Sequence, residues 1–133
     1  MREIIFRGKD EKTDEWAYGF YTLVSAGHGM KHAIITGTDR NCFVPVFVKR
    51  ETIGQFTGVE DRKGKMIFED DIVTLPRCGK GRKISIVYFK NGKFAVDGSN
   101  YSFKDLHGKV TEVIGNIYDN PGLLAKGERH GAE

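Results

Sequence analysis

Residues 84–97 read ISIVYFKNGKFAVD, and the Asn91-Gly92 pair near their centre decides the fold class. An Asn-Gly pair between two apolar runs is the strongest short-range signal for a β-hairpin, because a type I′ turn needs positive φ at both positions. The flanking runs, Ile84–Lys90 and Lys93–Asp97, therefore predict two antiparallel strands.

Outward from this hairpin, the chain consists of short apolar runs separated by glycine-containing turns. Its 17 glycines are about twice the usual share, and the period of an amphipathic helix is nearly absent. The turn Asp61–Gly64 predicts a second hairpin, between Glu51–Gly58 and Lys65–Leu75. Further strands are predicted over Glu3–Arg7, Glu15–Ser25, Lys31–Thr36, Cys42–Val48 and Val110–Tyr118. This pattern predicts an all-β protein with short helical turns, built as a small barrel or as two β subdomains that share a core.

Two of these strands are rich in large apolar side chains. By the two-residue period of a strand, one face of Glu15–Ser25 carries Trp16, Tyr18, Phe20, Thr22 and Val24. Aromatic residues in such a stripe are more often core than binding surface, so we expect this face to be buried. The segment Cys42–Val48 is apolar on both faces and is also expected to be buried, although Pro45 favours an edge position or a bulge.

The 133 residues fit one domain over residues 1–125, with subdomains 1–50 and 51–125 as the alternative division. Helix is expected only in short pieces, at Tyr101–Leu106 and after Asn120-Pro121, where an N-cap residue precedes a favourable first helical residue. The polar residues 126–133 predict a flexible tail. No apolar run is long enough for a membrane span and the N-terminus lacks a signal-peptide pattern, so a cytoplasmic protein is expected.

The positive charge is concentrated in one third of the chain. The net charge is +3, but residues 77–109 alone hold eight Lys or Arg against two Asp or Glu. Such a concentration can attract phosphates, and the neighbouring Tyr88, Phe89 and Phe94 could stack on unpaired bases. The candidate nucleic-acid contacts are Arg77, Lys80, Arg82, Lys83, Lys90 and Lys93. The competing interpretation is a solvated lysine-rich face beside core aromatics.

No constellation of residues calls for a catalytic or metal site. His28 and His32 lie in or beside a glycine-rich loop, and Cys42 and Cys78 form no Cys-x-x-Cys pair, so zinc is not expected. The triplet Glu69-Asp70-Asp71 could bind magnesium, but it suits a tight turn better and no nucleophile accompanies it. No serine has a Gly-x-Ser-x-Gly setting. We therefore predict no enzymatic activity, no metal and no cofactor.

The chain carries a set of motifs that points to a family. Glu51–Gly58 is followed by Asp61, Gly64-Lys65, Ile67-Phe68-Glu69 and Asp71-Ile72-Val73, and this series resembles the hallmark of the YopX family of phage and prophage proteins. The start of the chain, residues 1–7, and its late segment Glu112–Pro121 are also similar to that family. The resemblance implies a mostly β protein with an SH3-like barrel, encoded by a bacteriophage or prophage, and it brings no catalytic residues.

The chain departs from this family at Asp70, where the resemblance implies a glycine between two acidic residues. If the position needs positive φ, aspartate tolerates it better than most residues but less well than glycine. We therefore expect that Asp70→Gly leaves stability unchanged or raises it.

These observations favour a non-catalytic β-barrel protein-interaction module, a phage accessory protein of the bacterial cytoplasm. Exposed strand edges favour pairing with another protein or with a further copy of the chain. The alternative is a nucleic-acid-binding module that uses the basic segment 77–109.

Overall fold

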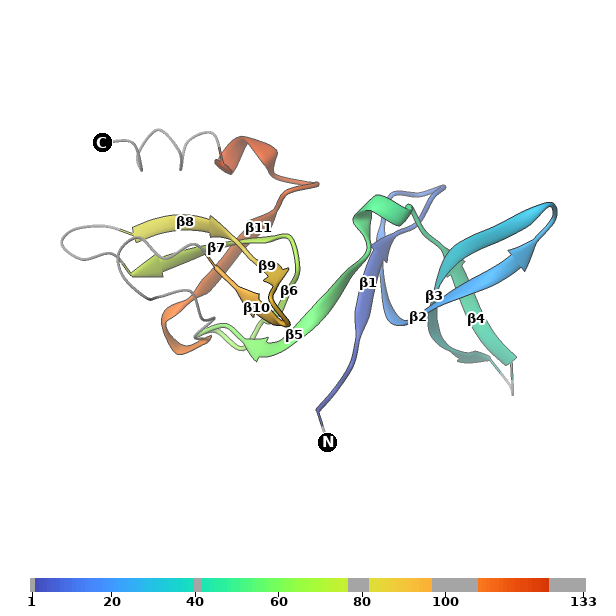
Figure 1. Cartoon of the computed structure of the whole chain (residues 1–133), viewed down its shortest axis with the longest axis horizontal. Helices are drawn as coiled ribbons and strands as arrows, with labels where there is room; N and C mark the ends of the chain where they lie inside the picture. The colour runs from blue at the N-terminus through green and yellow to red at the C-terminus, as the bar shows by residue number, and fades with distance from the viewer. Residues whose placement is uncertain (1, 40–41, 77–81, 97–107, 125–133) are drawn as a thin grey trace. The chain divides into compact units, whose positions relative to one another are not determined.

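The computed structural model describes residues 2–39, 42–76, 82–96 and 108–124 (Figure 1). The chain divides into two compact units, Met1–Phe56 and Thr57–Glu133, and each contains its own buried apolar cluster. The all-β prediction is confirmed, because the described strands form antiparallel sheets and the only α-helical turn in the described ranges spans residues 121–124. That turn begins at Pro121, directly after Asn120, as predicted.

The N-terminal unit is a meander with the strand order β4-β3-β2-β1-β5. A 3₁₀ turn at Arg50–Thr52 leads into β5, which continues past the end of this unit. The strands are β1 (Phe6–Lys9), β2 (Trp16–Ala26), β3 (Gly29–Asp39), β4 (Cys42–Phe47) and β5 (Gly54–Glu60). The core forms around the buried residues Ala17, Ile34 and Val48.

The C-terminal unit contains β6 beside β5, a three-stranded sheet in the order β11-β7-β8, and the hairpin β9–β10. These strands are β6 (Met66–Phe68), β7 (Asp71–Pro76), β8 (Arg82–Ile86), β9 (Tyr88–Lys90), β10 (Lys93–Ala95) and β11 (Glu112–Asn116). A 3₁₀ turn, Gly108–Val110, precedes β11. The core of this unit is formed by Ile67, Val73, Leu75, Val87 and Val96.

Two predicted long strands are each divided in the structure. Lys65–Leu75 breaks at a turn where Asp70 has φ 69°, which confirms the expectation of positive φ at this residue. Ile84–Lys90 breaks at Val87, whose N–H donates to the carbonyl of Asp71 at 2.9 Å and whose carbonyl accepts from the N–H of Asp70 at 2.8 Å. These tertiary hydrogen bonds replace continuous pairing along both strands.

The hairpin predicted around Asn91-Gly92 is present between β9 and β10. Asn91 has φ 54° and Gly92 has φ 79°, so both central residues have the positive φ of a type I′ turn. In neither unit do the described strands close into a barrel, so the SH3-like barrel is not seen in these parts of the chain.

Some predictions concern residues outside the described ranges, and others stay untested predictions. The helical turn at Tyr101–Leu106 and the tail 126–133 lie outside the described ranges. The single domain over residues 1–125, with its alternative division at residue 50, stays a prediction. Among the described residues, no helix is both long and apolar enough to cross a membrane.

Candidate functional site

One side of the N-terminal sheet carries a cluster of apolar side chains that we call the aromatic face. Its centre is the cross-strand row Phe20–Ile35–Pro45, in which each residue is the register partner of the next. Tyr18 and Phe43 lie two residues away along β2 and β4 and therefore project from the same side. Phe43 is 72% exposed, Phe20 67% and Tyr18 47%, so large apolar side chains are in contact with solvent.

The prediction that the aromatic stripe of β2 is buried is wrong for Tyr18 and Phe20, while Trp16, Thr22 and Val24 of the same stripe are half-buried. The alternate positions of β2, which include Ala17, Gly19 and Tyr21, are the ones that face the core. A Cβ atom at Gly19 would overlap the carbonyl oxygen of Ile35, so only glycine permits this approach of the two backbones. In β2 the side that packs against the core is marked by the small residues Ala17 and Gly19, and not by the aromatic stripe.

The expectation of a well-buried Cys42–Val48 is also wrong, whereas the edge position indicated by Pro45 is confirmed. In the N-terminal sheet β4 is the outermost strand, and Phe43, Val44 and Pro45 are exposed. Val48 is buried and Val46 packs against the core, so the segment is only partly buried.

The outer edge of β4 is poorly suited to strand addition. The N–H of Val48 donates inward to the carbonyl of His32 at 3.0 Å, so Phe47 and Pro45 direct their backbone groups outward. The outward carbonyl of Phe47 already accepts a hydrogen bond from the N–H of Glu11 at 3.0 Å, and Pro45 has no N–H. Over this stretch, a partner would contact side chains instead of extending the sheet.

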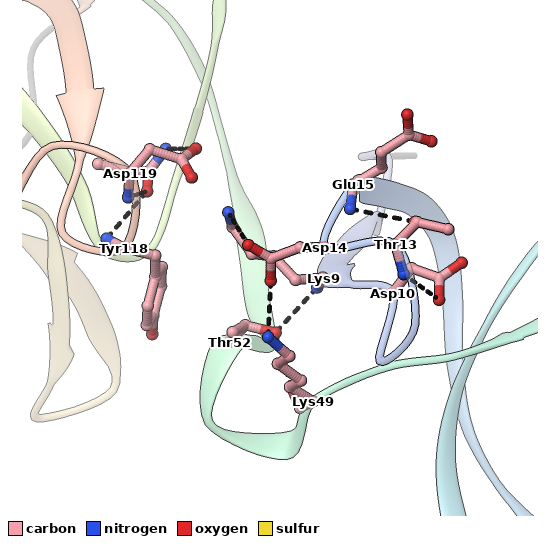
Figure 2. Close-up of polar contacts among 10 residues, drawn as sticks. Lys9, Asp10, Thr13, Asp14, Glu15, Lys49, Thr52, Tyr118 and Asp119 are labelled. Carbon is pink, nitrogen blue, oxygen red and sulfur yellow. Dashed lines mark hydrogen bonds and ion pairs between the residues drawn. The ribbon is translucent and has the colours of Figure 1, made fainter.

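An ion cluster fixes the turn between β1 and β2, as Figure 2 shows. Asp14, which has φ 64°, binds Lys49 Nζ at 2.7 Å and Lys9 Nζ at 3.4 Å. The hydrogen bond from Lys49 is the main reason why the pKa of Asp14 lies below its ordinary value. The backbone N–H of Lys9 also donates to Thr52 Oγ1 at 2.8 Å, which ties β1 to the 3₁₀ turn.

The same turn positions Trp16 beside two cations. Lys9 and Trp16 are register partners, and so are Arg7 and Tyr18. The Arg7 guanidinium lies 4.4 Å and the Lys9 ammonium 5.2 Å from the centroid of the indole ring. Both basic side chains are buried, so they support the start of β2 and are not an accessible anion site.

The structure places three of the six predicted basic contacts. Lys90 and Lys93 are direct partners across the β9–β10 hairpin, and Lys83 lies on β8 opposite Leu75. Arg82 begins β8, and only its backbone is described. Arg77 and Lys80 lie outside the described residues.

Next to the lysine pair, Phe89 and Phe94 are also register partners, with ring centroids 5.0 Å apart. Phe89 is 54% exposed. The predicted neighbourhood of basic and aromatic side chains is therefore present in this hairpin.

Asp70, Asp71 and His32 have hydrogen-bond partners within the fold. Asp71 is buried and its Oδ2 accepts from the N–H of Phe68 at 2.8 Å, while Asp70 Oδ2 accepts from the Tyr118 hydroxyl at 2.6 Å. His32 Nδ1 and the Tyr21 hydroxyl share a hydrogen bond of 2.6 Å, and His28 lies in an exposed turn. Within the described ranges, no group of three or more His, Cys, Asp or Glu side chains could hold a metal ion.

Comparison with known proteins gives a family and two similar folds. The family described as YopX protein matches residues 5–125. The crystal structure of protein EF1440 from Enterococcus faecalis is similar, with a TM-score of 0.58 and 26% identity over 93% of this chain and 99% of that one. Protein yopX from Bacillus subtilis has a TM-score of 0.58 and 24% identity over 90% of this chain and 96% of that one. A comparison with curated proteins gives no match.

Proposed function

Because the chain belongs to the YopX protein family, we propose that it is a non-catalytic protein-interaction module, encoded by a phage or prophage and active in the bacterial cytoplasm. The phage origin rests on the family resemblance of the sequence. The interaction role rests on the surface of the N-terminal unit.

The observation that carries the proposal is the exposure of the aromatic face. Of the nine large apolar side chains that are exposed among the described residues, seven lie in the N-terminal unit, and three of these belong to the aromatic face. Tyr18, Phe20 and Phe43 stand together on one side of β2–β4. Contiguous exposed apolar side chains on a small protein are typical of an interaction surface, because their burial against a partner removes them from water.

The partner that this surface fits is a second copy of the same chain. None of the five residues of the aromatic face is charged, so in an interface between two copies related by a twofold axis this face itself brings no like charges together. Because the outer edge of β4 is poorly suited to strand addition, we expect the two copies to associate through side-chain packing. The central row Phe20–Ile35–Pro45 then lies in the interface.

Sedimentation equilibrium of the full chain tests this proposal. The wild type is expected to associate reversibly as concentration rises, and the double variant Phe20→Ser/Phe43→Ser is expected to stay monomeric. The matched control is Leu23→Ser/Met30→Ser, because these two exposed side chains project from the opposite side of the sheet. The control should associate like the wild type, and thermal unfolding should show that all three proteins are folded.

Two results would overturn the proposal. If the wild type is monomeric at every concentration, the chain does not self-associate. Equal association of the wild type and the Phe20→Ser/Phe43→Ser variant would place the interface elsewhere on the chain.

A further inference from the structure

The β9–β10 hairpin projects from a buried base to an exposed end. Val87 immediately precedes β9, Val96 immediately follows β10, and both are fully buried in the core of the C-terminal unit. At the other end, Lys90, Asn91, Gly92 and Lys93 are exposed. The base is therefore fixed, while the end is exposed to solvent.

Two like charges face each other at this end. Lys90 and Lys93 are register partners on either side of the two-residue turn, so their side chains leave the same face of the ribbon. Like charges directly opposite each other across an antiparallel pair destabilise it. The two ammonium groups on one face of this exposed end offer an anion two charge-assisted contacts.

The other face of the same ribbon is aromatic. Phe89 and Phe94 pair with an interplanar angle of 58°, and Phe89 keeps more than half of its surface exposed. An exposed phenyl ring that is held by a second ring is a suitable platform for a nucleic-acid base. Phe89 and Lys90 are consecutive and project from opposite faces of the ribbon, so a single strand that crosses the exposed end can place a base on the ring and a phosphate beside the ammonium groups.

We propose that the end of the β9–β10 hairpin binds single-stranded nucleic acid. Lys90 and Lys93 neutralise backbone phosphates, and Phe89 stacks on an unpaired base. This site is separate in sequence and in residues from the aromatic face, so it goes beyond the protein-interaction role. The excess of basic over acidic residues in 77–109 provides a favourable field for an anionic chain.

Fluorescence anisotropy with a labelled oligothymidine strand, titrated at several salt concentrations, tests the lysine pair. Lys90→Glu/Lys93→Glu is expected to weaken binding strongly and to reduce the magnitude of the log–log salt slope by about 1.4, since each phosphate contact on a single strand contributes about 0.7. The charge-matched control Lys12→Glu/Arg50→Glu changes two exposed basic residues of the N-terminal unit and should leave the slope unchanged.

The role of Phe89 has a separate readout. Phe89→Ser is expected to weaken binding about tenfold through lost stacking, without changing the salt slope. The labelled duplex of the same sequence should bind more weakly than the single strand, because its bases are not available to the ring. Equal affinity for duplex and single strand would overturn the single-strand assignment.

A stability measurement separates binding from folding. The single variant Lys90→Glu creates an opposite-charge pair with Lys93 and is expected to raise the melting temperature of the protein while it weakens oligonucleotide binding. The proposal is overturned if the wild type does not bind at low salt, or if the double lysine variant binds with unchanged affinity and slope.

Discussion

The hydroxyl of Tyr118 donates a hydrogen bond of 2.6 Å to Oδ2 of Asp70, which connects the residue that follows β11 by two positions to the turn between β6 and β7. The backbone of the same turn is also bound to this segment, because the N–H of Ile117 donates to the carbonyl of Asp70 at 3.0 Å. Asp70 therefore combines an unfavourable positive φ with a favourable side-chain contact.

These two contributions oppose each other when Asp70 is replaced. Relief of the left-handed conformation by glycine is worth about 1 kcal/mol, and a half-buried hydrogen bond to a carboxylate is worth about 1.5 kcal/mol. Asp70→Gly should therefore change the free energy of unfolding by less than about 1 kcal/mol. The control Asp70→Ala loses the hydrogen bond and keeps the strain, so it should be clearly less stable than Asp70→Gly.

A double-mutant cycle in denaturant unfolding separates the two contributions. Tyr118→Phe should destabilise the wild type by about 1.5 kcal/mol and should have almost no effect in the Asp70→Gly background. Equal destabilisation in both backgrounds would show that the hydrogen bond contributes nothing to stability.

Acid lability of the C-terminal unit is predicted from Asp61. Burial alone raises the pKa of this carboxyl, but hydrogen bonds from the N–H groups of Val113, Lys65 and Lys63 outweigh burial and hold the pKa below its ordinary value of 3.8. A lowered folded-state pKa stabilises the fold fully above the unfolded value, and this stabilisation is lost as pH falls through the folded value.

The wild type should therefore lose stability below about pH 4, and Asp61→Asn should be less stable at neutral pH but less sensitive to acid. Urea unfolding of both proteins at a series of pH values, followed by circular dichroism, measures the difference. Because Asp10, Asp14 and Glu112 also have lowered pKa values, only the difference between the two proteins reports on Asp61. Parallel pH profiles would contradict this assignment.

Close approach of β2 and β3 makes Gly19 sensitive to substitution. A methyl group at this position would overlap the backbone of Ile35, so Gly19→Ala should destabilise the N-terminal unit by about 1–3 kcal/mol. Gly29→Ala is the matched control, because a Cβ atom there meets nothing within 4 Å. Trp16 fluorescence during denaturant unfolding reports on the stability of this unit. Equal stability of the two variants would contradict the prediction, because it would show that β2 and β3 can move apart at no cost.

The parts of the fold that depend on local chemistry could be predicted from the sequence. The Asn91-Gly92 hairpin follows from φ preferences, the edge position of β4 from the missing N–H of Pro45, and positive φ at Asp70 from the family resemblance. The tight turn at Glu69-Asp70-Asp71 could be predicted from its residue types, whereas the break at Val87 could not be predicted, because it depends on hydrogen bonds to a segment far away in the chain.

In the candidate surfaces, too, local features could be predicted from the sequence and tertiary features could not. The two-residue period correctly placed Tyr18 and Phe20 on one face, but periodicity alone does not determine which face of a strand packs against the core. The pairing of Lys90 with Lys93 follows directly from the two-residue turn, whereas the positions of Arg77 and Lys80 do not follow from any local pattern.

The central claim, that the aromatic face is the interaction surface, is tested most directly by NMR spectra recorded during serial dilution of the wild-type chain. The resonances of Tyr18, Phe20 and Phe43 are expected to shift with concentration, while those of Leu23 and Met30 on the opposite side of the sheet are expected to stay constant. Spectra that do not change with concentration, or changes confined to Leu23 and Met30, would contradict this claim.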